Sequence, residues 1–389
     1  MSRAVIVAGV RTPITKARKG KFAAVDARFL AEKAIGAALV RSRIPTHDIE
    51  DIVLAESLQG GSVIARYAAV NLGMSQVPGL AVNRHCAGGL GAVQTAVSFI
   101  RAGANDVLIA GGTESMSSMP VLFKPGADGQ LQPWPNLTHP DRQDAPAMDM
   151  SITVGENTAK TMGLTRRDVD EWAAYSQGRA IYAIDNGHFD AEIIGVEAPQ
   201  LDGSLATVTL DEQPRRGTTV ESLGELKVLH PEIENPTVTA GNAAGLNDAA
   251  AALMIVSEEY AAAHGLTPLG TVREWGVSAV DPYDTGLAPI PAIEKALAKS
   301  KLGIGDIASW EINEAFCAVP VAATRKLGID PSLVNVNGSG ASIGHPIAAT
   351  GARMVVTMLN ELKRQDAQFG VVSMCAGGGM GSALVVERL

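Results

Sequence analysis

The strongest constraint on the fold of this 389-residue chain is that its second half repeats the order of its first half. Residues 39–49 align without a gap with residues 297–307, and each segment passes from an expected helix towards an expected strand. One short match could arise by chance, but a shared order of helix, strand, glycine-rich turn, helix and strand favours an internal duplication. Two equivalent sheets would bring turns from both halves to one crevice. The other matching pairs are Val82-Asn83 with Val336-Asn337, and Ala110-Gly111-Gly112 with Ala376-Gly377-Gly378.

Hydrophobic periodicity predicts an α/β chain with an excursion in its middle third. Strands separated by helices predict βαβ units and a largely parallel sheet. Six prolines between residues 120 and 146 argue against a continuous sheet there. We therefore expect an N-terminal half at 1–116 that is completed by about 240–266, an inserted loop domain at 117–239, and a C-terminal half at 267–389. Strands are expected at 4–8, 51–55, 79–83 and 106–115, with the last closed by its glycines, and helices at 27–41, 65–71, 90–101, 151–162 and 167–186.

Composition excludes several classes of function. A net charge of −9 argues against general binding to nucleic acid or to an anionic membrane surface. The apolar runs are too short for a signal peptide or a membrane span. Three cysteines without a CxxC pair give no zinc site and are typical of a reducing cytoplasm.

Cys86 stands where an expected strand turns into an expected helix. A thiol at a helix N-terminus faces unpaired backbone N–H groups and the positive end of the helix dipole, which favour the nucleophilic thiolate. Gly88 and Gly89 would let a substrate approach the turn closely. Taken alone, the residue fits a buried, inert cysteine better, because free cysteine is among the most buried residue types.

Three turns of the second half carry further reactive side chains. His345 stands between Gly344 and Pro346 before an expected helix, and Cys375 ends an expected strand beside a run of glycines. Asn313 and Glu314 stand where a strand gives way to a helix. Each has a structural alternative, as a core histidine, a small apolar residue or a helix cap. Together, a nucleophile, a base, a second thiol and an amide on glycine-rich turns indicate a catalytic site.

These residues resemble the motifs of the thiolases, which are acyl-CoA C-acetyltransferases. The likeness covers essentially the whole chain and implies a five-layer αβαβα sandwich of two similar halves, with a loop domain inserted in the first. Its markers, in the family's order, are Val82-Asn83-Arg84-His85-Cys86, Ala240-Gly241-Asn242-Ala243 with Gly245-Leu246-Asn247-Asp248, Asn313-Glu314-Ala315-Phe316, Gly344-His345-Pro346 with Ala349-Thr350-Gly351-Ala352-Arg353, and Cys375 with residues 377–381.

The resemblance also implies a role for each site residue. Cys86 would take the acyl group after His345 removes its proton, and Cys375 would protonate the departing enolate and later deprotonate coenzyme A. Asn313 would hold a water that forms one oxyanion hole with His345, and the backbone amides of Cys86 and Gly377 would form the other. Coenzyme A, a co-substrate rather than a tightly bound cofactor, would contact Arg215, Ala244 and Met150. A solvated surface charge is the alternative for Arg215.

Departures from the family pattern favour one kind of thiolase. Asp149 stands where acetoacetyl-specific biosynthetic members carry His, and the cationic loop of the tetrameric biosynthetic enzymes is not evident between 116 and 148. Gly88 and Ala244 stand where the family has serine. We therefore expect a degradative 3-ketoacyl-CoA thiolase of β-oxidation or other lipid degradation that forms a homodimer or homotetramer. The alternatives are a biosynthetic acetoacetyl-CoA thiolase, a ketoacyl-synthase-like condensing enzyme, and a non-catalytic lipid carrier.

Overall fold

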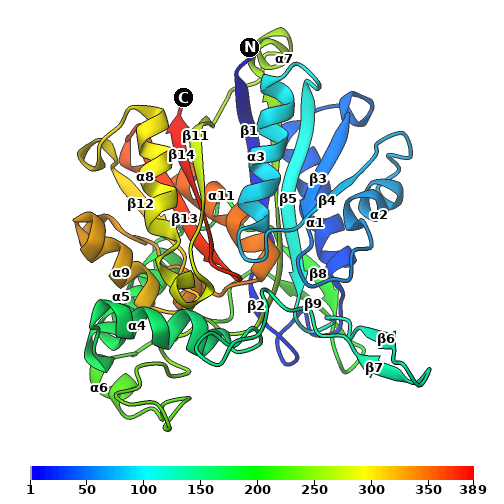
Figure 1. The fold of residues 1–389 in the computed structure, drawn as a ribbon. Helices are drawn as coiled ribbons and strands as arrows, with labels where there is room; N and C mark the ends of the chain where they lie inside the picture. Colours follow the sequence, from blue (N-terminus) through cyan, green and yellow to red (C-terminus); the bar gives the residue numbers. More distant parts are fainter. Residues whose placement is uncertain (1) are drawn as a thin grey trace.

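The computed structural model describes residues 2–389, and its main sheet consists of two half-sheets joined edge to edge (Figure 1). The order across both is β12-β13-β14-β11-β1-β10-β5-β3-β4, and β2 (Thr15–Lys16) pairs with β10. β1 and β11 share a single residue pair, Ile6 with Gly270, which marks the join. The first half-sheet contains β1 (Ala4–Arg11), β3 (Asp51–Ala55), β4 (Leu80–Val82), β5 (Val107–Ser115) and β10 (Asn247–Ser257), and the second contains β11 (Gly270–Ala279), β12 (Ser309–Ile312), β13 (Phe369–Ala376) and β14 (Met380–Arg388).

The two half-sheets have the same pairing pattern. β3 and β5 are parallel, whereas β5–β10 and β10–β1 are antiparallel. In the second half β12 and β13 are parallel, whereas β13–β14 and β14–β11 are antiparallel. The segments aligned from the sequence also share their local geometry: α1 (Ala27–Ser42) and α8 (Pro289–Ser300) both end at a left-handed residue, Arg43 and Lys301, each with φ 57°. The repeated order in the sequence is thus a repeated topology. The expectation of a largely parallel sheet is wrong, because parallel pairing is confined to β3 with β4 and β5 and to β12 with β13, while the pairs made by β1, β10, β11 and β14 are antiparallel.

Helices form three layers that alternate with the half-sheets, which confirms the expected five-layer sandwich (Figure 1). Alternation along β10 shows why, because successive residues of a strand point to opposite faces. Ala252 and Met254 pack in the core beneath α1, whereas Leu253 and Ile255 pack in the core between the half-sheets. The outer layers are α1 with α2 (Ile64–Asn71), and α8 with α9 (Ala318–Leu327), while the central layer is α3 (Gly88–Arg101) with α11 (Ile347–Gln365).

The two central helices cross at glycines near their N-termini. A Cβ atom on Gly89 would lie 2.6 Å from the backbone nitrogen of Ala352 and 2.7 Å from the carbonyl oxygen of Ala348. A Cβ on Gly351 would lie 2.4 Å from the backbone nitrogen of Leu90. Only residues without a side chain permit this approach, so the N-termini of α3 and α11 are held together.

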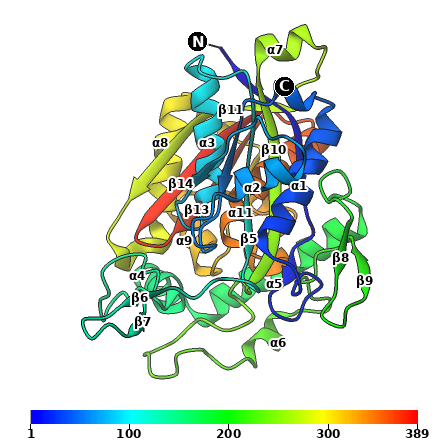
Figure 2. The same cartoon turned by 90° about the vertical axis from the view of Figure 1, so that its right-hand side faces the viewer.

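The middle third lies at the end of the half-sheets remote from both termini (Figures 1 and 2). We propose residues 117–239 as the insertion, because β10 then returns between β1 and β5 of the first half-sheet. The remaining short helices are α7 (Glu258–Ala263) and α10 (Gly340–Ile343). The elements of the insertion are β6 (Phe123–Pro125), β7 (Leu131–Pro133), a π-helix (Ser151–Glu156), α4 (Asn157–Met162), α5 (Arg166–Asp185), β8 (Val196–Pro199), β9 (Leu205–Val208) and α6 (Val220–Gly224).

Two local expectations differ from the structure. Gly111 and Gly112 do not close their strand, because β5 continues to Ser115. A Cβ on Gly112 would lie 2.0 Å from the carbonyl oxygen of Ala348, so these glycines admit the backbone of α11 against the strand. Val336-Asn337 does not end a strand either, since the only pairing nearby in residues 2–389 is an isolated bridge between Trp310 and Val334. Within the same described range, no helix is long and apolar enough to cross a membrane.

Candidate active site

Cys86 lies on a sharp turn between β4 and α3. His85 has a left-handed backbone, with φ 45°, and Asn83 supports it by accepting a hydrogen bond from the His85 backbone N–H at 2.8 Å. The Ser57 hydroxyl donates to the His85 carbonyl oxygen at 2.8 Å. Cys86 itself remains partly exposed. The turn is therefore pinned on both sides of a residue that solutes can reach.

The Cys86 thiol is neutral in the resting site. Burial raises its pKa to about 11, and the nearby Glu114 carboxylate acts in the same direction. The Gly377 backbone N–H, which lies near the sulfur, acts in the opposite direction. The expectation that the helix N-terminus favours the thiolate is thus outweighed, because desolvation disfavours a charge more than these amides stabilise it.

Cys375 lies at the C-terminal end of β13 and faces Cys86. It is 2% exposed, and both burial and the proximity of the Cys86 thiolate form raise its pKa well above its ordinary value. Gly377 follows in the turn to β14, where a Cβ would lie 2.6 Å from the Thr138 side chain. The duplication therefore brings the sulfur atoms of Cys86 and Cys375, one from each half, into one site.

The third cysteine plays no part in this group. Cys317 is fully buried in the core beneath the second half-sheet, and burial raises its pKa. All three cysteines are free thiols. Among residues 2–389, no three His, Cys, Asp or Glu side chains are grouped so as to hold a metal ion.

Asn313 is fully buried directly after β12. Its backbone N–H donates to the Ser373 carbonyl oxygen of β13 at 2.9 Å, two residues before Cys375. The next residue, Glu314, anchors the loop through its carboxylate, which accepts hydrogen bonds from Trp172 at 2.9 Å and from Asn335 at 2.7 Å. Glu314 therefore has a structural role, while the Asn313 amide is presented to the neighbouring His345.

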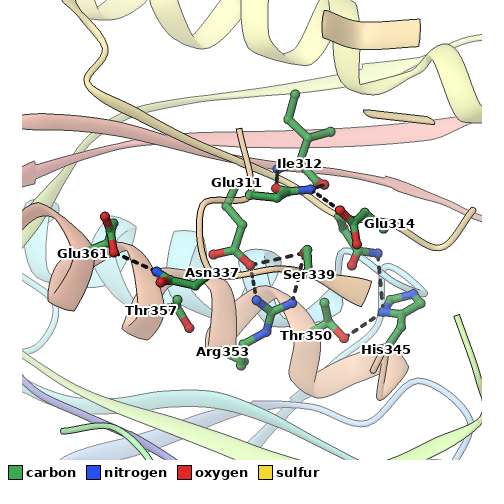
Figure 3. A network of polar contacts seen from close by, with 12 residues as sticks. Glu311, Ile312, Glu314, Asn337, Ser339, His345, Thr350, Arg353, Thr357 and Glu361 are labelled. Carbon is green, nitrogen blue, oxygen red and sulfur yellow. Dashed lines mark hydrogen bonds and ion pairs between the residues drawn. The ribbon is translucent and has the colours of Figure 1, made fainter. Parts of the chain in front are cut away.

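His345 is buried immediately before α11 with one ring nitrogen bonded (Figure 3). Its backbone N–H donates to Asn247 Oδ1 at 2.9 Å. Nδ1 lies 2.7 Å from Thr350 Oγ1 and 3.4 Å from Asn313 Nδ2, whereas Nε2 has no partner in residues 2–389. Burial and the positive charge of Arg353 lower the pKa of the imidazole to about 3, so that it is neutral at physiological pH.

Contacts between elements bring these residues together from four segments. The first turns of α3 and α11 touch at Gly89 and Ala348, and Cys86 and His345 precede those two turns. Cys375 and Gly377 reach the same place, since both lie close enough to Cys86 to interact with it, and Asn313 reaches it through His345. A thiol, a second thiol, a neutral imidazole, a side-chain amide and a backbone amide suit acyl transfer.

Two of the three residues expected to contact coenzyme A lie beside this group. Met150 packs against the core that contains Cys375, and the Ala244 backbone N–H donates to the Ala315 carbonyl oxygen at 2.9 Å. Arg215 is exposed, and no hydrogen bond or ion pair within residues 2–389 joins its side chain to the others. Its backbone N–H donates to Gln177 at 2.8 Å, and its side chain forms no ion pair within residues 2–389, whereas the neighbouring Arg216 pairs with Asp185.

The structure adds three polar residues to which the sequence assigned no role. Glu114 is fully buried in β5 and accepts a hydrogen bond from the Ala348 backbone N–H at 3.0 Å, and burial raises its pKa to about 7. Asn247 and Thr350 hold His345. A charged residue at the end of a fully buried strand was a weak signal for Glu114, and the positions of Asn247 and Thr350 within the family's motifs were a weak signal for the other two.

Comparison with known proteins gives a consistent result over the whole chain. Residues 4–259 match the family model described as "Thiolase, N-terminal domain", and residues 266–388 match "Thiolase, C-terminal domain". An "Acetyl-CoA acetyltransferase" of Cupriavidus necator is 40% identical, and a "Probable acetyl-CoA acyltransferase" of Staphylococcus aureus is 38% identical, each with both chains fully covered. The crystal structure of human mitochondrial 3-ketoacyl-CoA thiolase is similar with a TM-score of 0.91 at 32% identity, covering 100% of this chain and 99% of the other.

Proposed function

Because the chain belongs to the thiolase family and is an acyltransferase, we propose that it cleaves 3-ketoacyl-CoA with coenzyme A to acetyl-CoA and a shortened acyl-CoA. The reaction is a reversible Claisen condensation with ping-pong kinetics through an acyl group on Cys86. The observation that carries the proposal is the meeting of Cys86, Cys375 and the Gly377 amide. A ketoacyl-synthase-like enzyme fits less well, because its second histidine has no counterpart among these residues.

The first half-reaction begins with transfer of the Cys86 proton to His345 Nε2. The Cys86 thiolate attacks the 3-keto carbon, and the C–C bond then breaks with its electron pair going to the acetyl-CoA enolate. Cys375 donates its proton to that enolate and becomes a thiolate. Because both thiols and the imidazole are neutral at rest, charge develops only as the substrate reacts.

The second half-reaction restores every proton. The Cys375 thiolate removes the proton of the coenzyme A thiol, whose sulfur attacks the acyl carbon on Cys86. The Cys86 thiolate leaves and takes back the proton held by His345. One acid/base thiol therefore serves both halves.

Oxyanion stabilisation would come from groups that already converge on the sulfur. The Gly377 N–H, which lies near Cys86 Sγ, would bind the carbonyl oxygen of the acyl group together with the Cys86 N–H. A water molecule held by Asn313 would stabilise the enolate oxygen together with His345. Removing one such donor typically costs about 3 kcal/mol of transition-state stabilisation.

Coenzyme A would extend from the thiols across the inserted region. Met150 and Ala244 would contact its pantetheine arm, although Ala244 lacks the hydroxyl of the family serine. Arg215 would meet a phosphate; the proposal is supported by its exposed side chain, which forms no ion pair within residues 2–389.

We propose the degradative direction because of the residue before Met150. Asp149 accepts hydrogen bonds from the Ser151 backbone N–H at 3.1 Å and from its hydroxyl at 2.5 Å, so its carboxylate is held by this turn. A carboxylate replaces the histidine of acetoacetyl-specific members. The biosynthetic acetoacetyl-CoA thiolase is the second candidate, and the acetyl-CoA acetyltransferase names of similar proteins favour it.

Acylation tests the nucleophile. Incubation with labelled acetyl-CoA should place label on the peptide containing Cys86, and Cys86→Ala should abolish it. Cys317→Ala is the matched control, because it removes a buried thiol outside the site and should retain the label. Label retained on Cys86→Ala, or none on the wild type, would contradict the proposal and favour the lipid carrier.

Turnover tests the second thiol and the direction. Cys375→Ser should still accept an acetyl group on Cys86 but should slow thiolysis by orders of magnitude, because a hydroxyl is a far weaker acid. Thiolysis rates over 3-ketoacyl-CoA thioesters of graded size separate the two candidates. A preference confined to acetoacetyl-CoA would support the biosynthetic one.

Assembly and location complete the proposal. We propose a homodimer or homotetramer, since the edge strand β4 and the exposed Tyr67 and Val70 of α2 offer a surface for another copy. Light scattering measures the assembly. We propose the cytoplasm as the compartment because the mechanism needs Cys86 and Cys375 as thiols.

A further inference from the structure

We propose that Thr350 is a positioning residue that holds His345 in the tautomer with the proton on Nδ1, which leaves the lone pair of Nε2 free to act as the base. The inference rests on the proposed function only in giving His345 the role of base. The contact that suggests it is the 2.7 Å distance between His345 Nδ1 and Thr350 Oγ1 (Figure 3).

The direction of this hydrogen bond follows from the second partner of the hydroxyl. Thr350 Oγ1 also lies 2.8 Å from the carbonyl oxygen of Pro346, one turn earlier. A carbonyl oxygen can only accept, so the single hydroxyl proton of Thr350 is committed to Pro346. Oγ1 then meets Nδ1 with its lone pairs, and the proton between them belongs to the imidazole.

One neighbouring group favours the opposite tautomer. The Asn313 Nδ2 group lies 3.4 Å from His345 Nδ1, and a hydrogen bond donated by that amide would require Nδ1 without a proton. N–H donors normally lie 2.7–3.2 Å from their acceptors. The Thr350 contact, shorter by 0.7 Å, therefore decides the tautomer.

The surroundings of His345 keep its ring neutral and fixed in position, so the single ring proton must be on one nitrogen or the other. Because burial and Arg353 lower the pKa of His345 to about 3, the ring carries one proton rather than two at neutral pH. Asn247 holds the His345 backbone, and the Thr350 N–H donates to the Pro346 carbonyl oxygen at 2.9 Å. Histidine and threonine thus belong to one fixed turn, in which a single hydroxyl selects the basic nitrogen.

The kinetic experiment compares two substitutions at Thr350. Thr350→Val removes the hydroxyl at nearly constant volume, and we expect the rate of Cys86 acylation to fall about 10- to 100-fold, as loss of one buried hydrogen bond predicts. Kd for acetyl-CoA should stay within about twofold, because Thr350 does not bind substrate. Thr350→Ser keeps the hydroxyl and should restore most of the rate.

The matched control is Thr357→Val on the same helix. Its hydroxyl donates to Glu192 at 3.1 Å rather than to His345, so acylation should stay near the wild-type rate. An equal loss of acylation rate in Thr350→Val and Thr357→Val would show that removing any buried hydroxyl of α11 slows the reaction, and it would overturn the proposal. So would a Thr350→Val variant that acylates at the wild-type rate.

The tautomer itself is measured by magic-angle-spinning NMR of protein labelled with ¹⁵N-histidine, with His345→Asn to assign the signal among seven histidines. We expect a protonated Nδ1 in the wild type and in Thr350→Ser, and a shift towards a protonated Nε2 in Thr350→Val. A protonated Nε2 in the wild type would overturn the inference. This readout needs no catalysis, so a protein that fails to acylate would refute the proposed function without affecting it.

Discussion

The crossing of α3 and α11 yields the sharpest prediction, because two identical substitutions on one helix should have opposite effects. Gly89 and Gly91 both lie in α3, and replacing either by alanine improves helix propensity by about 0.5–1 kcal/mol. Propensity alone would make both variants more stable. Packing separates them, since only Gly89 touches α11.

The structure sets the size of the difference. At Gly89 a Cβ would lie 2.6 Å from backbone of α11, whereas ordinary contact begins at 3.4 Å, so the helices must separate by about 0.8 Å. At Gly91 the nearest atom would be 3.9 Å away. Overpacking typically costs about 1–3 kcal/mol. We therefore expect Gly89→Ala to lose about 1–2 kcal/mol of unfolding free energy and Gly91→Ala to gain up to about 1 kcal/mol.

The same separation of α3 from α11 should also slow the reaction. A displacement of about 1 Å between reacting groups can cost on the order of 100-fold in rate, so Gly89→Ala should slow Cys86 acylation about 10- to 100-fold while Gly91→Ala leaves it unchanged. Urea unfolding and acylation by labelled acetyl-CoA measure the two quantities. Wild-type stability and rate in Gly89→Ala would refute the idea that this crossing sets the distance between Cys86 and His345.

Three further predictions concern charge. Burial raises the pKa of Glu114 from 4.5 to about 7, so its ionisation destabilises the fold as pH rises through that range; Glu114→Gln should gain up to about 3 kcal/mol relative to wild type between pH 4.5 and 8, measured by urea unfolding. Arg353→Met leaves the buried Glu311 carboxyl unpaired and should cost about 3–5 kcal/mol at pH 8, but clearly less at pH 5, where Glu311 is protonated; equal losses would contradict this. Arg215→Ala should raise KM for coenzyme A about fivefold with kcat unchanged, whereas Arg216→Ala should not, and steady-state kinetics checks both.

Local sequence patterns predicted most elements well. The strand at 51–55 agrees with β3, and the helix at 27–41 differs from α1 by one residue at its C-terminus. Such patterns work because each face of a strand or helix records the burial of its own residues. They failed at Gly111 and Gly112, where the reason for glycine is the distant helix α11 rather than a turn.

Local sequence patterns likewise predicted some residues of the candidate site and not others. Cys86, His345, Cys375 and Asn313 stand on turns that can be read locally, because glycines and helix starts mark them. The distant residues that hydrogen-bond to the site could not be predicted from local sequence. Glu114 meets Ala348 across 234 positions of the chain, and His345 meets Asn247 across 98. No local pattern states which distant groups share a turn.

The sequence by itself determined that two α/β halves repeat one order and that each contributes a cysteine on a glycine-rich turn, since repetition and turn chemistry are local properties. Only the tertiary structure decided that both thiols are neutral at rest, because desolvation depends on everything packed around a sulfur. It likewise decided which nitrogen of His345 is free, because that depends on a hydroxyl whose own proton is committed to a third group.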